Sequence, residues 1–285
     1  MDYILELKNV SKKYDGFALS DINIALPKGC IMGLIGENGA GKSTTIKMIL
    51  DAINKDGGSI SIFGQDNRDM PKRMWEDIGV VLDESCFPEN LSMKEINTIM
   101  KNVYKQWDAD LFRKYVNYFD LPEKKAMKDY SRGMKMKLGI AVALSHNAKL
   151  LILDEATSGL DPVVRDEMVE VFMDFIQDEE HSILMSSHIT SDLEKACDYI
   201  TFIHQGKILF SQGKDELLDK YGILKCAEEE LRVIDEAAIV GVRKHKFGVD
   251  ALVIRDKVRG NFIMDRADIE DIMLFQIKKD QSKEQ

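Results

Sequence analysis

Alternating apolar and polar positions predict strands over the first 35 residues of the chain. The apolar residues form two sets, which end at the turn signals Asp15-Gly16 and Pro27-Lys28-Gly29: Ile4, Leu5, Leu7 and Val10, then Leu19, Ile22, Ile24 and Leu26. Alternation of this kind is typical of strands with one buried face. The short apolar run Ile31–Ile35 predicts a buried strand, and a glycine-rich loop then leads into a predicted helix over Lys42–Ala52.

Helical spacing of apolar residues replaces this alternation between about residues 85 and 148. Outside that block, short apolar runs alternate with helical patterns. We expect strands at Ser59–Phe63, Ile78–Leu82, Leu150–Leu153 and Ile183–Ser186, helices at Pro162–Asp178, Ile189–Cys197 and from Lys214, and a hairpin over Tyr199–Ser211. Strands that alternate with helices imply a mainly parallel sheet covered on both faces. The predicted fold class is therefore α/β, with the helical block as a separate subdomain.

The composition fits a folded chain with an acidic surface. The chain has 285 residues, 45% of them hydrophobic, and a formal net charge of −10. The apolar fraction is too high for a disordered chain, and the acidic balance argues against nucleic acid as the main partner because its phosphates repel such a surface. The N-terminus lacks the pattern of a signal peptide, and no apolar stretch reaches the roughly 18 residues that span a bilayer. We therefore expect a soluble protein, or one that reaches a membrane only through a partner.

The four cysteines are far apart in the sequence and form no CxxC pair: Cys30, Cys86, Cys197 and Cys226. That spacing indicates neither a zinc site nor a dense disulfide framework. An even number of cysteines leaves disulfides open, but we expect reduced thiols in a cytosolic compartment.

One segment has the sequence of a phosphate-binding loop. It runs Gly36-Glu37-Asn38-Gly39-Ala40-Gly41-Lys42-Ser43-Thr44, which matches GxxxxGK[ST] between a predicted strand and a predicted helix. Glycines let successive N–H groups turn toward phosphate oxygens, and the start of the helix adds further N–H groups. We expect Lys42 to reach the β- and γ-phosphates, Ser43 to ligate Mg²⁺ and Thr44 to support the phosphates. The alternative is a glycine-rich turn that matches the pattern by chance.

Two acids follow the apolar run Leu150–Leu153, namely Asp154 and Glu155. A buried parallel strand delivers them to the carboxyl edge of the sheet, where ligands of open α/β sheets bind. Asp154 is expected to hold Mg²⁺ through its water shell, and Glu155 to orient or deprotonate an attacking water. An ordinary strand-to-loop transition with solvated acids is the alternative.

With these motifs in this order, the chain from about residue 2 to 220 resembles the ATP-binding cassette (ABC) ATPases. The resemblance implies a P-loop NTPase cassette with a mainly parallel core sheet, an N-terminal antiparallel β subdomain and a helical subdomain. It implies that Tyr14 stacks on adenine, a plain exposed tyrosine being the alternative. It also implies that ATP and Mg²⁺ are bound by the loop residues Gly36, Glu37, Asn38, Gly39, Ala40, Gly41, Lys42, Ser43 and Thr44.

Tyr130-Ser131-Arg132-Gly133-Met134-Lys135 lies where this family has its signature, usually written LSGGQ. The resemblance implies that Ser131 and Gly133, at the start of a helix, bind a phosphate of ATP held by the other protomer. Arg132 replaces the first glycine of the signature, and the glutamine is also replaced. Because the serine and the second glycine remain, we expect the function to survive.

Two further segments match the family, and a third aligns with it but departs from its pattern. Ser158–Pro162 resembles the D-loop, which crosses the dimer interface, and His188 resembles the switch histidine that contacts the γ-phosphate. An isolated histidine is otherwise more often structural. Asp83 follows the predicted strand Ile78–Leu82, at the position where the family has the glutamine of its Q-loop. It either binds Mg²⁺ or its water, or changes how ATP occupancy is transmitted to a partner.

The resemblance implies ATP hydrolysis between two cassettes that close head to tail, as a homodimer or a related heterodimer. Glu155 would activate water, His188 would hold the γ-phosphate, and Lys42 would neutralise charge. One functional class is the ATP-hydrolysing subunit of a transporter that resembles bacterial ABC-2 exporters, with a separate permease and coupling near Ser85–Leu91. The chain would then lie on the cytoplasmic face of the cell membrane. The other class is a soluble ABC ATPase used in translation or chromosome work, which the single cassette and the acidic charge disfavour.

The predicted organisation is a cassette over residues 1–221, with a helical subdomain at about 85–148, and a small α+β extension over 222–285. In the extension we expect a hairpin of Ile239–Arg243 and Ala251–Arg255 joined through Lys244–Asp250, then a helix over Asp268–Ile277. The apolar residues of that helix either pack against the cassette or belong to a dimerisation or regulatory element: Ile269, Ile272, Met273 and Phe275.

Overall fold

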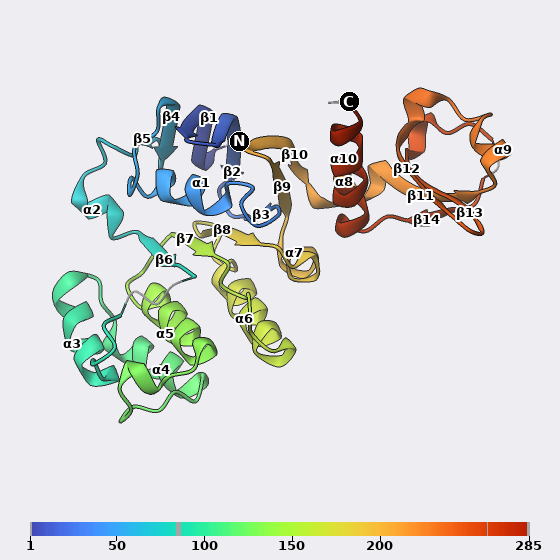
Figure 1. The fold of residues 1–285 in the computed structure, drawn as a ribbon. Coiled ribbons are helices and arrows are strands. Elements are labelled where there is room, and N and C mark those ends of the chain that lie inside the picture. The colour runs from blue at the N-terminus through green and yellow to red at the C-terminus, as the bar shows by residue number, and fades with distance from the viewer. Residues whose placement is uncertain (1, 84–86, 261, 284–285) are drawn as a thin grey trace. The chain divides into compact units, whose positions relative to one another are not determined.

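A six-stranded sheet carries most of the motifs (Figure 1). Its strand order is β10-β9-β3-β8-β7-β6, and the pairs β9–β3, β3–β8, β8–β7 and β7–β6 are parallel. The strands are β3 (Ile31–Ile35), β6 (Ile78–Val81), β7 (Leu150–Asp154), β8 (Ser182–Ser187), β9 (Tyr199–His204) and β10 (Lys207–Gly213). Because the strands are parallel, the loops after β3, β6, β7 and β8 all leave from one edge of the sheet. The predicted mainly parallel sheet is confirmed.

The computed structural model describes residues 2–83, 87–260 and 262–283, and the chain divides into two compact units, Met1–Ile208 and Leu209–Gln285. Cys86 and part of the expected coupling segment Ser85–Leu91 lie outside the described residues. No disulfide joins the cysteines at the three described positions, Cys30, Cys197 and Cys226. Within the described ranges, no helix combines the length and the apolar character that a membrane span requires.

An antiparallel sheet packs beside the parallel one in the first unit. Its order is β2-β1-β4-β5, formed by β1 (Tyr3–Tyr14), β2 (Phe17–Pro27), β4 (Gly57–Ile62) and β5 (Gln65–Asp66). The alternating residues of the N-terminal strands face inward, as predicted, and Leu5, Leu7, Leu19 and Leu26 are almost fully buried. They share one apolar core with residues of β3, β7, β8 and helix α1, so this core joins the two sheets.

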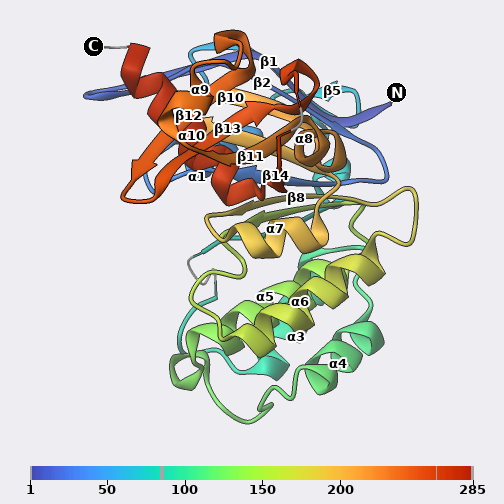
Figure 2. The same cartoon turned by 90° about the vertical axis from the view of Figure 1, so that its right-hand side faces the viewer.

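Seven helices accompany the sheets in the described part of the first unit. They are α1 (Lys42–Ile49), α2 (Lys72–Trp75), α3 (Met93–Val103), α4 (Ala109–Tyr118), α5 (Arg132–Leu144), α6 (Pro162–Phe175) and α7 (Thr190–Ala196). Figure 2 shows α3, α4 and α5 gathered in the helical block that the sequence predicts. Side-chain caps fix several of these helix starts: Ser92 forms a capping box before α3, Asp108 caps α4, and Asp161 caps α6.

The second unit contains its own antiparallel sheet, of order β12-β13-β11-β14. Its elements are α8 (Lys214–Lys220), β11 (Tyr221–Cys226), α9 (Glu228–Leu231), β12 (Ile239–His245), β13 (Gly248–Ile254), β14 (Met264–Arg266) and α10 (Ile269–Lys283). The sequence patterns predicted neither β11 nor β14. The division between the units falls at Ile208, and α8 packs on β11 within the second unit. The expectation that the cassette ends at residue 221 stays a prediction.

The hairpin of the second unit is tighter than the sequence predicted. Its strands pair up to His245 and Gly248, so the connection is Lys246-Phe247 and not Lys244–Asp250. The carboxylate of Asp250 explains the longer ladder, because it accepts a hydrogen bond from Arg243 at 3.0 Å and lies 3.3 Å from the ring of His245. Polar residues that looked like a loop are therefore paired across the strands.

Helix α10 packs on strands β12 and β13 of its own unit. Ile269, Ile272 and Phe275 are buried, and the ring of Phe275 lies against Gly241, where an added Cβ would come within 3.1 Å of it. The sequence analysis offered packing against the cassette or a dimerisation or regulatory role, and it did not consider packing against the sheet of the same unit. Their burial is accounted for by the sheet next to them in the chain.

Candidate functional site

The phosphate-binding loop follows β3 and leads directly into α1. Gly41 precedes the helix at φ +114°, a conformation that favours glycine, and a Cβ there would lie 2.4 Å from the side chain of Leu19. No side chain caps the helix, so its first N–H groups are available to an anion. Glu37, Asn38, Gly39 and Ser43 are exposed, Thr44 is partly buried, and Gly36 and Ala40 are buried. The loop thus has the strand, glycines and helix that phosphate binding requires.

Lys42 is buried at the centre of this loop, with 5% of its side chain exposed. Its ammonium group donates hydrogen bonds to the backbone carbonyls of Gly36 at 2.7 Å and Glu37 at 3.3 Å. It also lies 3.1 Å from the carboxylate of Glu155. A buried ammonium group requires such partners because removing it from water is costly. The same group, released from Glu155, can bind a phosphate oxygen.

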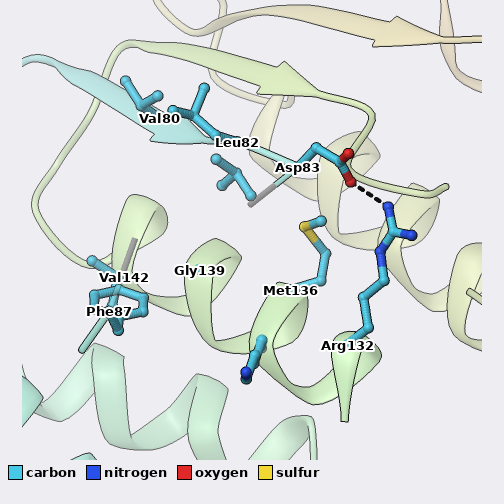
Figure 3. Close-up of a pocket in the computed structure, with 10 residues that line it drawn as sticks. Val80, Leu82, Asp83, Phe87, Arg132, Met136, Gly139 and Val142 are labelled. Atoms are coloured by element: carbon cyan, nitrogen blue, oxygen red, sulfur yellow. Dashed lines mark hydrogen bonds and ion pairs between the residues drawn. The ribbon is translucent and has the colours of Figure 1, made fainter. Parts of the chain in front are cut away.

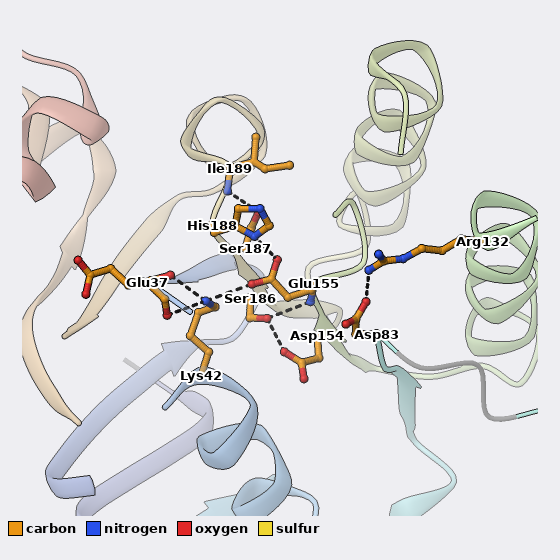
Figure 4. Close-up of polar contacts among 11 residues, drawn as sticks. Glu37, Lys42, Asp83, Arg132, Asp154, Glu155, Ser186, Ser187, His188 and Ile189 are labelled. Atoms are coloured by element: carbon orange, nitrogen blue, oxygen red, sulfur yellow. Dashed lines mark hydrogen bonds and ion pairs between the residues drawn. The ribbon is translucent and has the colours of Figure 1, made fainter. Parts of the chain in front are cut away.

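Ser186 joins the two acids at the end of β7, Asp154 and Glu155, and the sequence analysis did not identify it as a site residue. Its hydroxyl donates to the carboxylate of Asp154 at 2.6 Å and accepts from the backbone N–H of Glu155 at 3.0 Å (Figure 4). Ser186 and Asp154 are buried on the paired strands β8 and β7. The sequence gives no sign of this contact. Ser186 comes to lie opposite Asp154 only through the register in which β8 pairs with β7.

Glu155 connects the phosphate-binding loop to His188. One carboxylate oxygen faces Lys42, and the other lies 2.7 Å from Nδ1 of His188 (Figure 4). Glu155 has φ +52°, which turns the chain sharply after the strand. Its side chain is 12% exposed and that of His188 is 44% exposed. The structure therefore brings a cation, a carboxylate and an imidazole together at the carboxyl edge of the sheet, where they can act on a phosphate and a water.

Tyr14 is exposed at the end of β1, with the ammonium group of Lys12 5.6 Å from its ring centroid. Phe17, which pairs with Tyr14 across the β1–β2 turn, lines a cavity of about 400 Å³ beside the phosphate-binding loop. Loop residues Glu37, Asn38, Gly39 and Ala40 line the same cavity. The cavity has room for the base or sugar of a nucleotide, and its wall includes Phe17, which the sequence analysis did not identify.

Buried His204 faces the same loop from the end of β9. It is 2% exposed, and its Nδ1 lies 3.2 Å from the carboxylate of Glu37. That carboxylate is half exposed and belongs to the phosphate-binding segment. His204 was not identified from the sequence either, because nothing in the spacing of residues 37 and 204 indicates that they are neighbours.

The signature segment forms the start of α5. The hydroxyl of Ser131 accepts a hydrogen bond from the N–H of Met134 at 3.2 Å and so caps the helix. Gly133 follows in the first turn, where an added Cβ would lie 3.4 Å from the side chain of Leu160. Ser131 is exposed. Among the described residues, no hydrogen bond or ion pair of Lys42, Glu155 or His188 involves it. The first turn of α5 thus forms a surface separate from that network.

Asp83 pairs with Arg132 and not with Lys42, Glu155 or His188 among the described contacts. The Arg132 guanidinium donates to the Asp83 carboxylate, which joins the loop after β6 to the start of α5 (Figure 4). Both side chains are about half exposed. The sequence analysis treated the two residues as separate departures from the family pattern, and the structure brings them into one contact.

Comparison with known proteins gives a consistent result. The ABC transporter family model matches residues 19–158. The lantibiotic transport ATP-binding protein SrtF of Streptococcus pyogenes is 38% identical over 74% of this chain and 92% of its own length. The bacitracin transport ATP-binding protein BcrA of Bacillus licheniformis is 37% identical over 73% of this chain and 69% of its own.

A solved structure agrees with these relatives. It is described as the ATP binding subunit of an ABC transporter, and it superposes with a TM-score of 0.66 at 29% identity. The match covers 75% of this chain and 91% of the other. The likeness therefore extends over three quarters of this chain and nearly the whole of the other.

Proposed function

The chain belongs to the ABC transporter family of ATP-binding proteins, and on that premise we propose that it powers export through a separately encoded membrane permease. It is an ATPase of the cassette type. The observation that carries the proposal is the network in which Lys42, Glu155 and His188 meet at one edge of the sheet. The names of the relatives, which refer to lantibiotic and bacitracin transport, support a transporter role.

Hydrolysis of ATP in this site requires that Lys42 exchange partners. When the γ-phosphate enters the loop, its charge attracts the ammonium group away from the Glu155 carboxylate. Glu155 is then free to accept a proton from a water that attacks the γ-phosphorus, while the imidazole of His188 keeps that carboxylate oriented. Most of the rate enhancement comes from charge neutralisation by Lys42 and by the N–H groups of the loop.

The residues present also suit Mg²⁺. Asp154 offers a buried carboxylate whose orientation Ser186 fixes, and Ser43 offers an exposed hydroxyl at the start of α1. Hard oxygen donors of this kind fit Mg²⁺, which takes only one or two protein ligands when phosphates and waters supply the others. No three His, Cys, Asp or Glu residues come together as a metal-binding group in the part of the chain that the structure describes. The ion would polarise the phosphates. The role of Asp83 as a Mg²⁺ ligand stays a prediction and is not part of this proposal, because its carboxylate pairs with Arg132.

A second cassette completes the site in this proposal. Ser131 and Gly133 lie on a separate surface at the start of α5, so they would bind ATP that another copy holds. The two copies, identical or related, would close head to tail with ATP between them and reopen after hydrolysis. Because each copy supplies half of each site, activity per chain should rise with chain concentration.

The chain would work at the cytoplasmic face of the cell membrane, bound to its permease. A soluble ATPase of translation or chromosomes is the other candidate, and its support is limited to the absence of a membrane-spanning helix from the described residues. Affinity purification of the tagged full chain from detergent-solubilised membranes separates the two. The proposal expects a stoichiometric membrane protein whose presence stimulates ATP hydrolysis; sedimentation with ribosomes or DNA in its place would contradict it.

A further inference from the structure

Arg132 contacts two loops that are distant from it in the sequence. Its guanidinium donates to the carboxylate of Asp83, in the loop after β6. It also lies against Gly159, in the loop after β7, where an added Cβ would come within 3.0 Å of Nη1. Because Arg132 is the first residue of α5, one side chain joins the start of this helix to both loops.

A pocket lies beside this contact, between α5 and the end of β6. A cavity of about 260 Å³ runs along the helix, lined by residues that include Val81, Phe87, Met136 and Val142. Figure 3 shows the Asp83–Arg132 pair at one end of the cavity and Val142 at the other. A cavity removes the close contacts that would hold a helix rigidly in place. The ion pair therefore adds a fixed contact at an end of α5 that lies beside this open space.

The residues beside Arg132 are those proposed to bind ATP in a second copy. Ser131 caps α5 immediately before Arg132, and Gly133 follows it. A shift of the first turn would move the Ser131 hydroxyl and the Gly133 N–H together. The ion pair of Arg132 with Asp83 can therefore hold the first turn of α5 in place, and both residues depart from the family pattern.

We propose that Arg132 is a positioning residue, whose ion pair with Asp83 holds the start of α5 in the arrangement that receives ATP from a second copy. The proposal rests on the proposed function, because it assigns Ser131 and Gly133 to that ATP. The pair acts before ATP binds, by reducing the cost of ordering the surface. It takes no part in the chemical step, so it alters the ATP requirement more than the maximal rate.

A double-mutant cycle in the full chain tests the proposal. The variants are Asp83→Asn, Arg132→Gln and the combination, and steady-state ATP hydrolysis gives the half-saturating ATP concentration and kcat for each. Exposed ion pairs contribute modestly, so we expect each single variant to raise the half-saturating concentration about two- to fivefold. The double variant should raise it no further than a single one. Arg132→Lys should stay close to wild type, and kcat should change less than about twofold.

A matched pair elsewhere serves as the control. Lys195 and Asp166 join α7 to α6 at 2.8 Å and are about as exposed, at 62% and 58%. The same cycle with Lys195→Gln and Asp166→Asn should show no coupling in the ATP requirement. In added salt the Asp83–Arg132 coupling should shrink, because screening weakens exposed charges. Purely additive effects of Asp83→Asn and Arg132→Gln, or a fall in kcat with an unchanged ATP requirement, would overturn the proposal.

Amide hydrogen exchange without nucleotide gives a second test that needs no activity. Peptides covering the first turns of α5 should exchange faster in Asp83→Asn and Arg132→Gln, equally in both and no faster in the double variant. Peptides from α6 should be unchanged in all three. Unchanged exchange at α5 would overturn the positioning role even if the ATPase measurements changed. Absence of ATP hydrolysis by the wild-type chain would instead contradict the proposed function.

Discussion

The ammonium group of Lys42 lies 3.1 Å from the Glu155 carboxylate, whose other oxygen lies 2.7 Å from Nδ1 of His188. Each of these groups comes from a different segment: the phosphate-binding loop, the end of β7 and the end of β8. The carboxylate assigned to water activation is thus paired with the cation assigned to phosphate binding. In the proposed mechanism ATP has to break this pair, so nucleotide binding would also release the base.

Lys42→Met should weaken ATP binding strongly. The substitution removes the cation that contacts the phosphates, and a hydrogen bond to a charged group is worth about 1.5–3 kcal/mol, or roughly 10- to 100-fold in affinity. Equilibrium binding of a fluorescent ATP analogue to the purified chain measures the change. Lys47→Met is the matched control, because Lys47 lies exposed in the last turn of the same helix. Equal affinities in the two variants would show that Lys42 does not bind phosphate.

Ser186→Ala should raise the Mg²⁺ requirement for ATP hydrolysis about tenfold. Ser186 orients the Asp154 carboxylate, and residues that orient a metal ligand typically affect metal affinity by that order. Activity measured against Mg²⁺ at saturating ATP gives the half-maximal concentration. Ser182→Ala is the control, because Ser182 lies buried on the same strand and accepts from Gly29 at 3.0 Å, away from Asp154. A similar Mg²⁺ dependence in both variants would contradict the role of Ser186.

His146 should make the protein less stable in mild acid. Burial lowers its pKa from the ordinary 6.5, the carbonyl of Glu76 lies 3.0 Å from its Nδ1, and its ring stacks on Tyr104. Since the folded pKa is depressed, the unfolded chain binds the proton first as the pH falls below about 6.5. The free energy of unfolding then decreases with falling pH, by at most about 1.4 kcal/mol per unit from one such group.

Urea denaturation at several pH values between 8 and the acid limit of solubility measures this dependence. His146→Phe keeps an aromatic ring against Tyr104 and removes the titrating group. The variant should show a shallower loss of stability below pH 6.5 than wild type does. Identical slopes for the two proteins would show that His146 does not titrate as its burial implies.

Much of the first unit could be predicted from the sequence because its signals are local. Alternation predicted the strands β1 and β2, and the glycine-rich motif predicted the order of β3, loop and α1. Those signals depend on neighbouring residues in the chain. Helix ends were less accurate: α1 ends at Ile49 and not at Ala52. Asp51 has φ +52°, which takes the chain out of the helix although the N–H of Ala52 still bonds back to the carbonyl of Lys47.

The relationships that the sequence did not predict depend on pairing at long range. Ser186 reaches Asp154 only because β8 and β7 pair in one register, and Arg132 reaches Asp83 only because α5 lies beside β6. Strand β11 was missed because its neighbours in the sheet, β13 and β14, follow much later in the chain. Motifs therefore predicted which residues form the candidate site, and the roles of those residues stay predictions, whereas the contacts between them required the fold.

Hydrolysis by the Glu155→Gln variant tests the central claim most directly. The substitution preserves the shape of the side chain and removes its basicity, so we expect phosphate release to fall by about 10²- to 10⁴-fold while ATP still binds. Glu179→Gln, an exposed position outside the network, should hydrolyse ATP as wild type does. With hydrolysis blocked, size exclusion in ATP should show Glu155→Gln as a dimer. Phosphate release by Glu155→Gln at the wild-type rate would contradict the account, because the carboxylate between Lys42 and His188 would then not be the base.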